Sequence, residues 1–101
     1  MQTVEIGGQE YVLRCDLNAY EEIIERYGDL PTATAMGDDE RENMEKLKFL
    51  LATFINEHYA FCRKSERVTE TDVGRMMMPG ERAKVFRKLI ETINEAFAPK
   101  N

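Results

Sequence analysis

The chain has 101 residues, of which 43% are hydrophobic and 33% are charged, and its formal net charge at pH 7 is −5. This length and composition predict one globular domain and argue against a disordered chain. The acidic balance disfavours nucleic acid as a partner, because neutralising phosphates requires a concentrated basic face. No apolar run approaches the ~20 residues that span a bilayer, and the first residues lack the layout of a signal peptide, so we expect an intracellular protein without membrane contact.

Residues 2–15 have the pattern of a β-hairpin. Hydrophobic and polar side chains alternate on both sides of Gly7 and Gly8, and glycine tolerates the positive φ angles of a tight turn. A lone two-stranded hairpin is marginal in water. We therefore expect its apolar face to dock on helices, with pairing of its open edge to another chain as the alternative. Cys15 continues the alternation, which predicts a buried thiol.

The next segment has the pattern of an amphipathic helix over residues 17–27. Asp16 and Asn18 are alternative N-cap residues for this helix, and Gly28 suits its carboxyl-terminal end. Residues 29–39 contain a proline, a glycine and several small polar residues, and this composition predicts a loop.

Residues 40–64 form the longest predicted element, a helix of roughly 37 Å at about 1.5 Å per residue. The segment contains no proline or glycine, and its apolar side chains fall within one arc at about 100° per residue. The pattern predicts one buried face, around which the rest of the chain is arranged, with Cys62 as a second buried thiol. The apolar arc consists of Met44, Leu47, Leu50, Leu51, Phe54, Ile55, Phe61 and Cys62.

Two further helices are predicted after a polar break. The first covers residues 70–78 and begins at a capping pair formed by Thr69 and Asp72. A proline and a glycine separate it from the second, which covers residues 81–97 and carries apolar side chains on one face. The predicted fold is therefore mainly α (α+β), an N-terminal β-hairpin followed by about four helices, in a single domain over residues 1–101.

The sequence does not assemble a catalytic site. His58 is the only histidine, and it lies one helical turn from Cys62, so the two side chains can touch. A nucleophile and its base also need an orienting third group, and none is apparent, which favours a packed histidine. There is no zinc-ligand set, phosphate-binding glycine motif or Ca²⁺-loop spacing. We predict a non-enzyme without cofactor or metal; an enzyme using Cys62 and His58 would need both side chains accessible.

Candidate residues for contact with another protein lie outside the predicted core. Phe49 lies on the polar side of the long helix, with Tyr59 on one flank. We favour a Phe49 covered by the hairpin or the last helix, and the alternative is a binding surface. Three consecutive methionines cannot all face one core, so at least one is exposed or fills a gap; core filling is favoured over binding. The partner-binding candidates are Phe49, Tyr59, Met76, Met77 and Met78.

Two stretches carry the motifs of a known family. In TVEIGGQEYVLRCDLNAYEEIIERYGDL, a hairpin leads into a helix that opens with D-hydrophobic-N-A-hydrophobic-E, from Asp16 to Glu21, and closes at Gly28. In FINEHYAFCRKSERVTETDVGRMM, a long helix is followed by a polar break and a T-x-x-D-V-G helix that begins at Thr69. In the order and layout of these motifs, most of the chain resembles the small tail assembly chaperones of phages and prophages with long, non-contractile tails.

The resemblance implies a non-enzymatic helper of tail morphogenesis. Such a protein binds the tape measure protein and recruits tail tube protein in the cytoplasm of the bacterial host, and it is absent from the mature virion. The resemblance also implies that the chain self-associates into an oligomer. Many family members are made in a short form and in a longer form extended by frameshifting, and this chain resembles the short form. The alternative is a small helical adaptor or regulator that binds another protein outside tail assembly.

Overall fold

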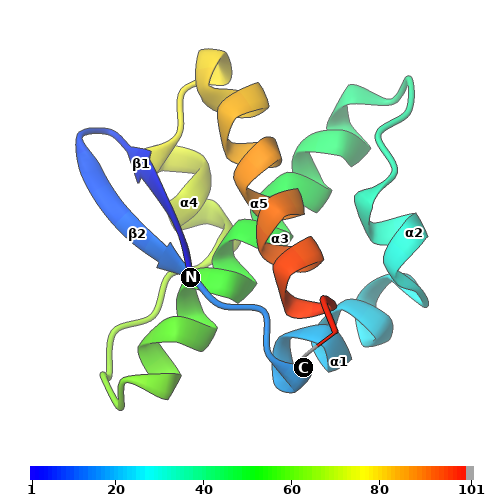
Figure 1. Ribbon diagram of the computed structural model, residues 1–101. Helices are drawn as coiled ribbons and strands as arrows, with labels where there is room; N and C mark the ends of the chain where they lie inside the picture. Colours follow the sequence, from blue (N-terminus) through cyan, green and yellow to red (C-terminus); the bar gives the residue numbers. More distant parts are fainter. Residues whose placement is uncertain (100–101) are drawn as a thin grey trace.

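The computed structural model describes residues 1–99 and places an N-terminal hairpin before a set of helices, which confirms the predicted fold class (Figure 1). Within the described part of the chain, none of the helices combines the length and the apolar character needed to cross a bilayer. The elements in chain order are β1 (Gln2–Ile6), β2 (Gln9–Leu13), α1 (Leu17–Tyr27), α2 (Leu30–Thr34), α3 (Glu40–Phe61), α4 (Glu70–Met76), the 3₁₀ turn η1 (Pro79–Glu81) and α5 (Arg82–Ala96).

The hairpin turns through its two glycines, as predicted. Gly7 and Gly8 have φ angles of 59° and 80°, which are the two positive values that a type I′ turn requires. The strands are antiparallel, with Val4 opposite Tyr11. Val4 and Ile6 are buried, because β1 packs on α5 and β2 packs on α3. Docking of the apolar face on helices is therefore confirmed.

Of the two predicted N-cap residues of α1, Asp16 forms the cap. The Asp16 carboxylate accepts a hydrogen bond from the Ala19 backbone N–H at 3.1 Å, which satisfies a donor that the helix itself leaves free. The Asn18 amide instead donates to the Glu57 carboxylate at 3.5 Å. Gly28 ends the helix with a φ of 87°, in the left-handed region that glycine tolerates.

The prediction of a loop over residues 29–39 is wrong in its first half. Leu30–Thr34 form the short helix α2, which the Asp29 carboxylate caps by accepting a hydrogen bond from the Thr32 N–H at 2.7 Å. Pro31 lies in the first turn of α2. A backbone N–H at this position would have no acceptor within the helix, so proline, which lacks it, is tolerated there. The Asp-x-Pro order was thus a helix-start signal rather than a loop signal.

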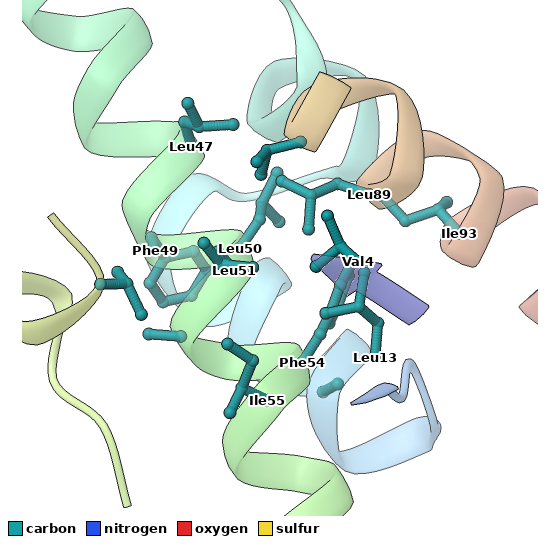
Figure 2. Packing of buried hydrophobic residues seen from close by; sticks show 14 of the residues in the cluster. Val4, Leu13, Leu47, Phe49, Leu50, Leu51, Phe54, Ile55, Leu89 and Ile93 are labelled. Carbon is teal, nitrogen blue, oxygen red and sulfur yellow. The ribbon is translucent and has the colours of Figure 1, made fainter. Parts of the chain in front are cut away.

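The long helix α3 is buried on all sides in its middle, so the prediction of a single buried face is wrong there. Every residue from Phe49 to Ile55 is buried, because β2, α1, α4 and α5 all pack against this helix (Figure 2). Three members of the predicted apolar arc are instead exposed: Met44 at 40%, Phe61 at 58%, and Cys62. In α3, one face is therefore buried in the first turns and all sides are buried in the middle.

The carboxyl-terminal boundaries differ from the predictions by a few residues. α3 ends at Phe61 rather than at residue 64, because Arg63 adopts a φ of 58° and a residue in this left-handed conformation terminates a helix. α4 ends at Met76 rather than at residue 78. The capping box of α4 is confirmed, with the Asp72 N–H donating to the Thr69 hydroxyl at 2.9 Å and the Thr69 N–H donating back at 2.8 Å.

Candidate functional site

A groove opens beside the first turns of α3, between this helix and the chain that joins α4 to α5. Its volume is about 960 Å³. Thioether and other apolar side chains line it together with charged groups. We call it the methionine groove, and its apolar lining includes Met44, Leu47, Met77, Met78 and Pro79.

A smaller hollow of about 370 Å³ adjoins the methionine groove. Leu47, Pro79 and Arg82 line both depressions, so the two share a wall. The smaller hollow adds Met36 and Phe86 to the apolar surface. Four of the six methionines of the chain thus line adjoining depressions at one end of α3.

The backbone around the methionine run explains how its side chains separate. Met76 is the last residue of α4, whereas Met77 and Met78 have extended conformations. Successive side chains in extended chain point to opposite sides. Met76 and Met77 consequently pack against the core, and Met78 is 66% exposed. The prediction that at least one of the three is exposed or fills a gap is confirmed.

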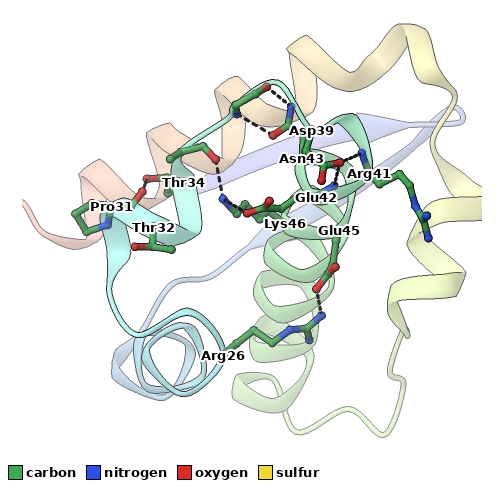
Figure 3. A network of polar contacts seen from close by, with 12 residues as sticks. Arg26, Pro31, Thr32, Thr34, Asp39, Arg41, Glu42, Asn43, Glu45 and Lys46 are labelled. Carbon is green, nitrogen blue, oxygen red and sulfur yellow. Dashed lines mark hydrogen bonds and ion pairs between the residues drawn. The ribbon is translucent and has the colours of Figure 1, made fainter.

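Buried polar contacts fasten the chain between α2 and α3 to the rim of the smaller hollow (Figure 3). The Lys46 ammonium group is buried, donates to the Ala35 carbonyl at 2.9 Å and pairs with Glu42 at 3.2 Å. The Asn43 amide donates to the Gly37 carbonyl at 2.9 Å and accepts from the Gly37 N–H at 3.0 Å. Met36 lies between these two anchored residues, so its backbone is fixed although its side chain is 39% exposed.

Phe49 is not part of this site: the favoured expectation that it is covered is confirmed, and the alternative of an exposed contact surface is not what the structure shows. It is only 9% exposed. The Tyr27 ring packs edge-on against it at a centroid distance of 5.5 Å, and the Arg26 guanidinium lies 4.8 Å from its centroid. The cover therefore comes from α1, and not from the hairpin or the last helix as predicted.

The structure does not bring Tyr59 together with the methionines. Tyr59 is partly buried and packs against the core near the carboxyl-terminal end of α3. Met44 lies near the other end, about 22 Å away along the helix axis at 1.5 Å per residue. Of the five candidates, Met77 and Met78 line the groove, and Met36 and Met44 were missed as site residues. The unusual number of methionines was the available signal.

A second apolar surface lies where α1 begins and α5 ends. Leu17 is 80% exposed and Phe97 is 51% exposed. The Phe97 ring meets the Tyr20 ring edge-on at a centroid distance of 5.0 Å. All three residues line a hollow of about 480 Å³, which has no methionine run and is separate from the methionine groove.

The contact between Cys62 and His58 forms, but the prediction that Cys62 is buried is wrong. The Cys62 Sγ is exposed and lies 3.6 Å from the His58 Nε2. Partial burial and then the charges of Lys64 and Arg14 lower the pKa of His58, so the imidazole is neutral at pH 7 and cannot stabilise a thiolate by charge. Within residues 1–99, the ring has no hydrogen-bond partner other than Cys62, so the orienting third group of a triad is missing.

The surroundings of the other thiol, Cys15, disfavour its thiolate form. Cys15 is half-buried, and burial, followed by the charge of Asp16, raises its pKa to about 11. In the described part of the chain, no three or more His, Cys, Asp or Glu side chains are grouped to hold a metal ion.

Comparison of the chain with protein-family models, curated proteins and solved structures finds no match.

Proposed function

We propose that this chain is a non-enzymatic phage tail assembly chaperone that binds the tape measure protein through the methionine groove and helps the tail tube to assemble. The observation that carries the proposal is the clustering of Met36, Met44, Met77 and Met78 on one accessible surface. The resemblance of the sequence to such chaperones supplies the identity of the client. The interaction takes place in the cytoplasm of the host, before the tube closes around the tape measure protein.

Thioether side chains suit a client with varied apolar segments. Methionine is unbranched and flexible, so it adapts to differently shaped partners. Several copies of a small acidic carrier on one long client gain affinity through a high effective concentration, even when each contact is weak. The net charge of −5 keeps such a complex soluble. Recruitment of tube protein and self-association belong to the same proposal.

The test is co-expression with the tape measure protein encoded nearby. We expect that protein to become soluble and to co-purify with the chain. The double variant Met44→Glu with Met78→Glu places charges in the groove and should reduce co-purification at least tenfold. Both positions are exposed enough for the fold to survive, which circular dichroism and urea unfolding would verify.

Leu17→Glu with Phe97→Glu is the matched control, because it adds the same two negative charges at exposed apolar residues of the second apolar surface. Co-purification should be unchanged in this variant. Equal losses in both variants would remove the groove from the proposal. A tape measure protein that is equally soluble without the chain would overturn the function, and would favour the alternative of an adaptor for a different partner.

A further inference from the structure

The charged residues around the methionine groove are mostly paired within the chain. Glu42 pairs with Lys46 at 3.2 Å, and Glu45 pairs with Arg26 at 3.1 Å. Arg82 pairs with Glu40 at 2.8 Å, and this contact raises the pKa of the guanidinium and lowers that of the carboxyl. The charges of Glu42 and Glu40 are therefore compensated locally. Arg26, in contrast, is shared between Glu45 and Glu70, which lies 3.0 Å from it, so one negative charge remains in that cluster.

The remaining acid of the groove is also satisfied. The Asp39 carboxylate caps α3 by accepting hydrogen bonds from the backbone N–H groups of Arg41 and Glu42 at 3.0 and 3.2 Å. A carboxylate in this position is stabilised by the amino-terminal end of the helix dipole. A cationic partner would have to compete with the backbone for this carboxylate.

Arg41 and Lys48 line the groove and have no ion-pair partner among residues 1–99. Figure 3 shows the Arg41 side chain extending away from Asp39, with no contact from its guanidinium to the other residues drawn. The two cations are seven residues apart, about 10 Å along the axis of α3. Met44 lies between them on the same face, three residues from one and four from the other.

We infer that the methionine groove accepts an acidic amphipathic helix, in which apolar side chains pack on Met44 and Met78 while two carboxylates pair with Arg41 and Lys48. In a partner helix, a carboxylate at position i and another at i+7 span the same distance of about 10 Å. Apolar side chains at i+3 and i+4 lie between them on the same face. This inference rests on the proposed protein-binding function and adds the chemistry of the bound segment. It runs against the net charge of −5, which alone would favour a basic partner.

The test uses two labelled peptides of about 15 residues, the length at which isolated helices become marginally stable. Both peptides carry the same leucine face, and they differ only in having two glutamates or two lysines at positions i and i+7. We expect the intact chain to bind the glutamate peptide about fivefold more tightly by fluorescence anisotropy, with the preference shrinking as salt is added.

Charge reversal at the groove should reverse this preference. The variant Arg41→Glu with Lys48→Glu is expected to bind the lysine peptide more tightly. The neutral variant Arg41→Gln with Lys48→Gln is expected to bind the two peptides equally. This variant tests the inference if the charge-reversed variant fails to fold. Lys64→Glu with Arg87→Glu is the matched control, because it makes the same change in net charge at two exposed cations that line neither depression; it should keep the original preference.

Two results would overturn the inference. One is a lysine peptide that binds the intact chain as tightly as the glutamate peptide, and the other is a preference that the groove variants leave unchanged. If neither peptide binds while Met44→Glu with Met78→Glu still abolishes co-purification, the inference fails and the proposed function stands. If that double variant has no effect on co-purification, the role of the groove in the proposed function fails as well.

Discussion

The middle of α3 and its first turns belong to one helix but meet different surroundings. From Phe49 to Ile55 every residue is buried, since strands and helices pack on all sides. In the first turns, Asn43, Lys46 and Leu47 are buried, while Met44 reaches the methionine groove. The helix is thus divided along its length into a stretch that holds the fold together and a stretch that lines an accessible surface.

This division changes where a binding surface is to be sought. If a helix buries only one face, its opposite face is free to bind a partner. For this reason Phe49, on the polar side of the predicted helix, was a candidate contact residue. Because α1 covers Phe49, the free surface of α3 lies toward its amino-terminal end instead. A close-packed stretch tolerates little change in volume, whereas flexible thioethers at a groove tolerate much more. The following substitutions test this contrast.

The largest effect is expected in the middle of the helix. Phe54 is fully buried, so Phe54→Ala removes its packing and leaves a cavity, which lowers the free energy of unfolding by about 3–5 kcal/mol. Urea unfolding would measure the loss. Met78→Ala is the control at a 66% exposed position and should change stability by less than about 0.5 kcal/mol. Similar losses in both variants would contradict the division of α3.

The next effect concerns the buried ammonium group near the boundary between the two stretches. Lys46→Met preserves the length of the side chain but removes the donor to the Ala35 carbonyl. We expect the free energy of unfolding to fall by about 2 kcal/mol, because a hydrogen bond from a charged donor is lost. Lys84→Met is the control, since Lys84 pairs with Glu81 on the surface. An equal effect of the two substitutions would mean that Lys46 does not anchor the chain before α3.

Local signals in the sequence predicted most of the elements. The glycine pair specified the hairpin turn, and Asp16 with Gly28 specified the two ends of α1, which has its predicted bounds. Thr69 and Asp72 specified the start of α4. Each of these signals acts over a few residues, so no knowledge of the tertiary structure was needed. The helix α2 was missed because its proline and small residues are equally typical of loops.

Burial around α3 could not be predicted in the same way. The apolar arc describes one helix, whereas the burial of Lys46 and Phe49 depends on where α1 and the chain after α2 pack. The candidate site was predicted in part, through Met77 and Met78. Met36 joins it only because contacts to Lys46 and Asn43 hold its neighbours against α3, and such long-range placement leaves no mark on the local sequence.

A smaller effect on stability is expected at the groove. Met44 is 40% exposed, so Met44→Ala removes apolar contact from one side only and should lower the free energy of unfolding by about 1 kcal/mol. The same substitution should weaken co-purification of the tape measure protein, because it deletes an apolar side chain from the groove lining. Measuring both quantities on one variant separates folding from binding. A loss as large as that of Phe54→Ala would place Met44 in the core.

The smallest effect is expected just beyond the buried stretch, at Glu57. Its pKa is raised above the ordinary value of 4.5, first by partial burial and then by its hydrogen bond to Asp16 and the negative charge there. The folded chain therefore holds this proton more tightly than the unfolded chain does. Stability from the protonated carboxyl is present at low pH and is lost as the pH rises through the raised pKa.

Glu57→Gln should remove this pH dependence. The amide can donate to Asp16 and accept from Asn18 at any pH, so the variant should be more stable than the parent chain at pH 7 by about 0.5 kcal/mol. Below pH 4.5 the parent carboxyl carries its proton and the gain should vanish. Urea unfolding at pH 7 and pH 4 measures both values. A gain of the same size at both pH values would mean that the substitution acts through packing, and the buried stretch of α3 would then extend beyond Ile55 to Glu57.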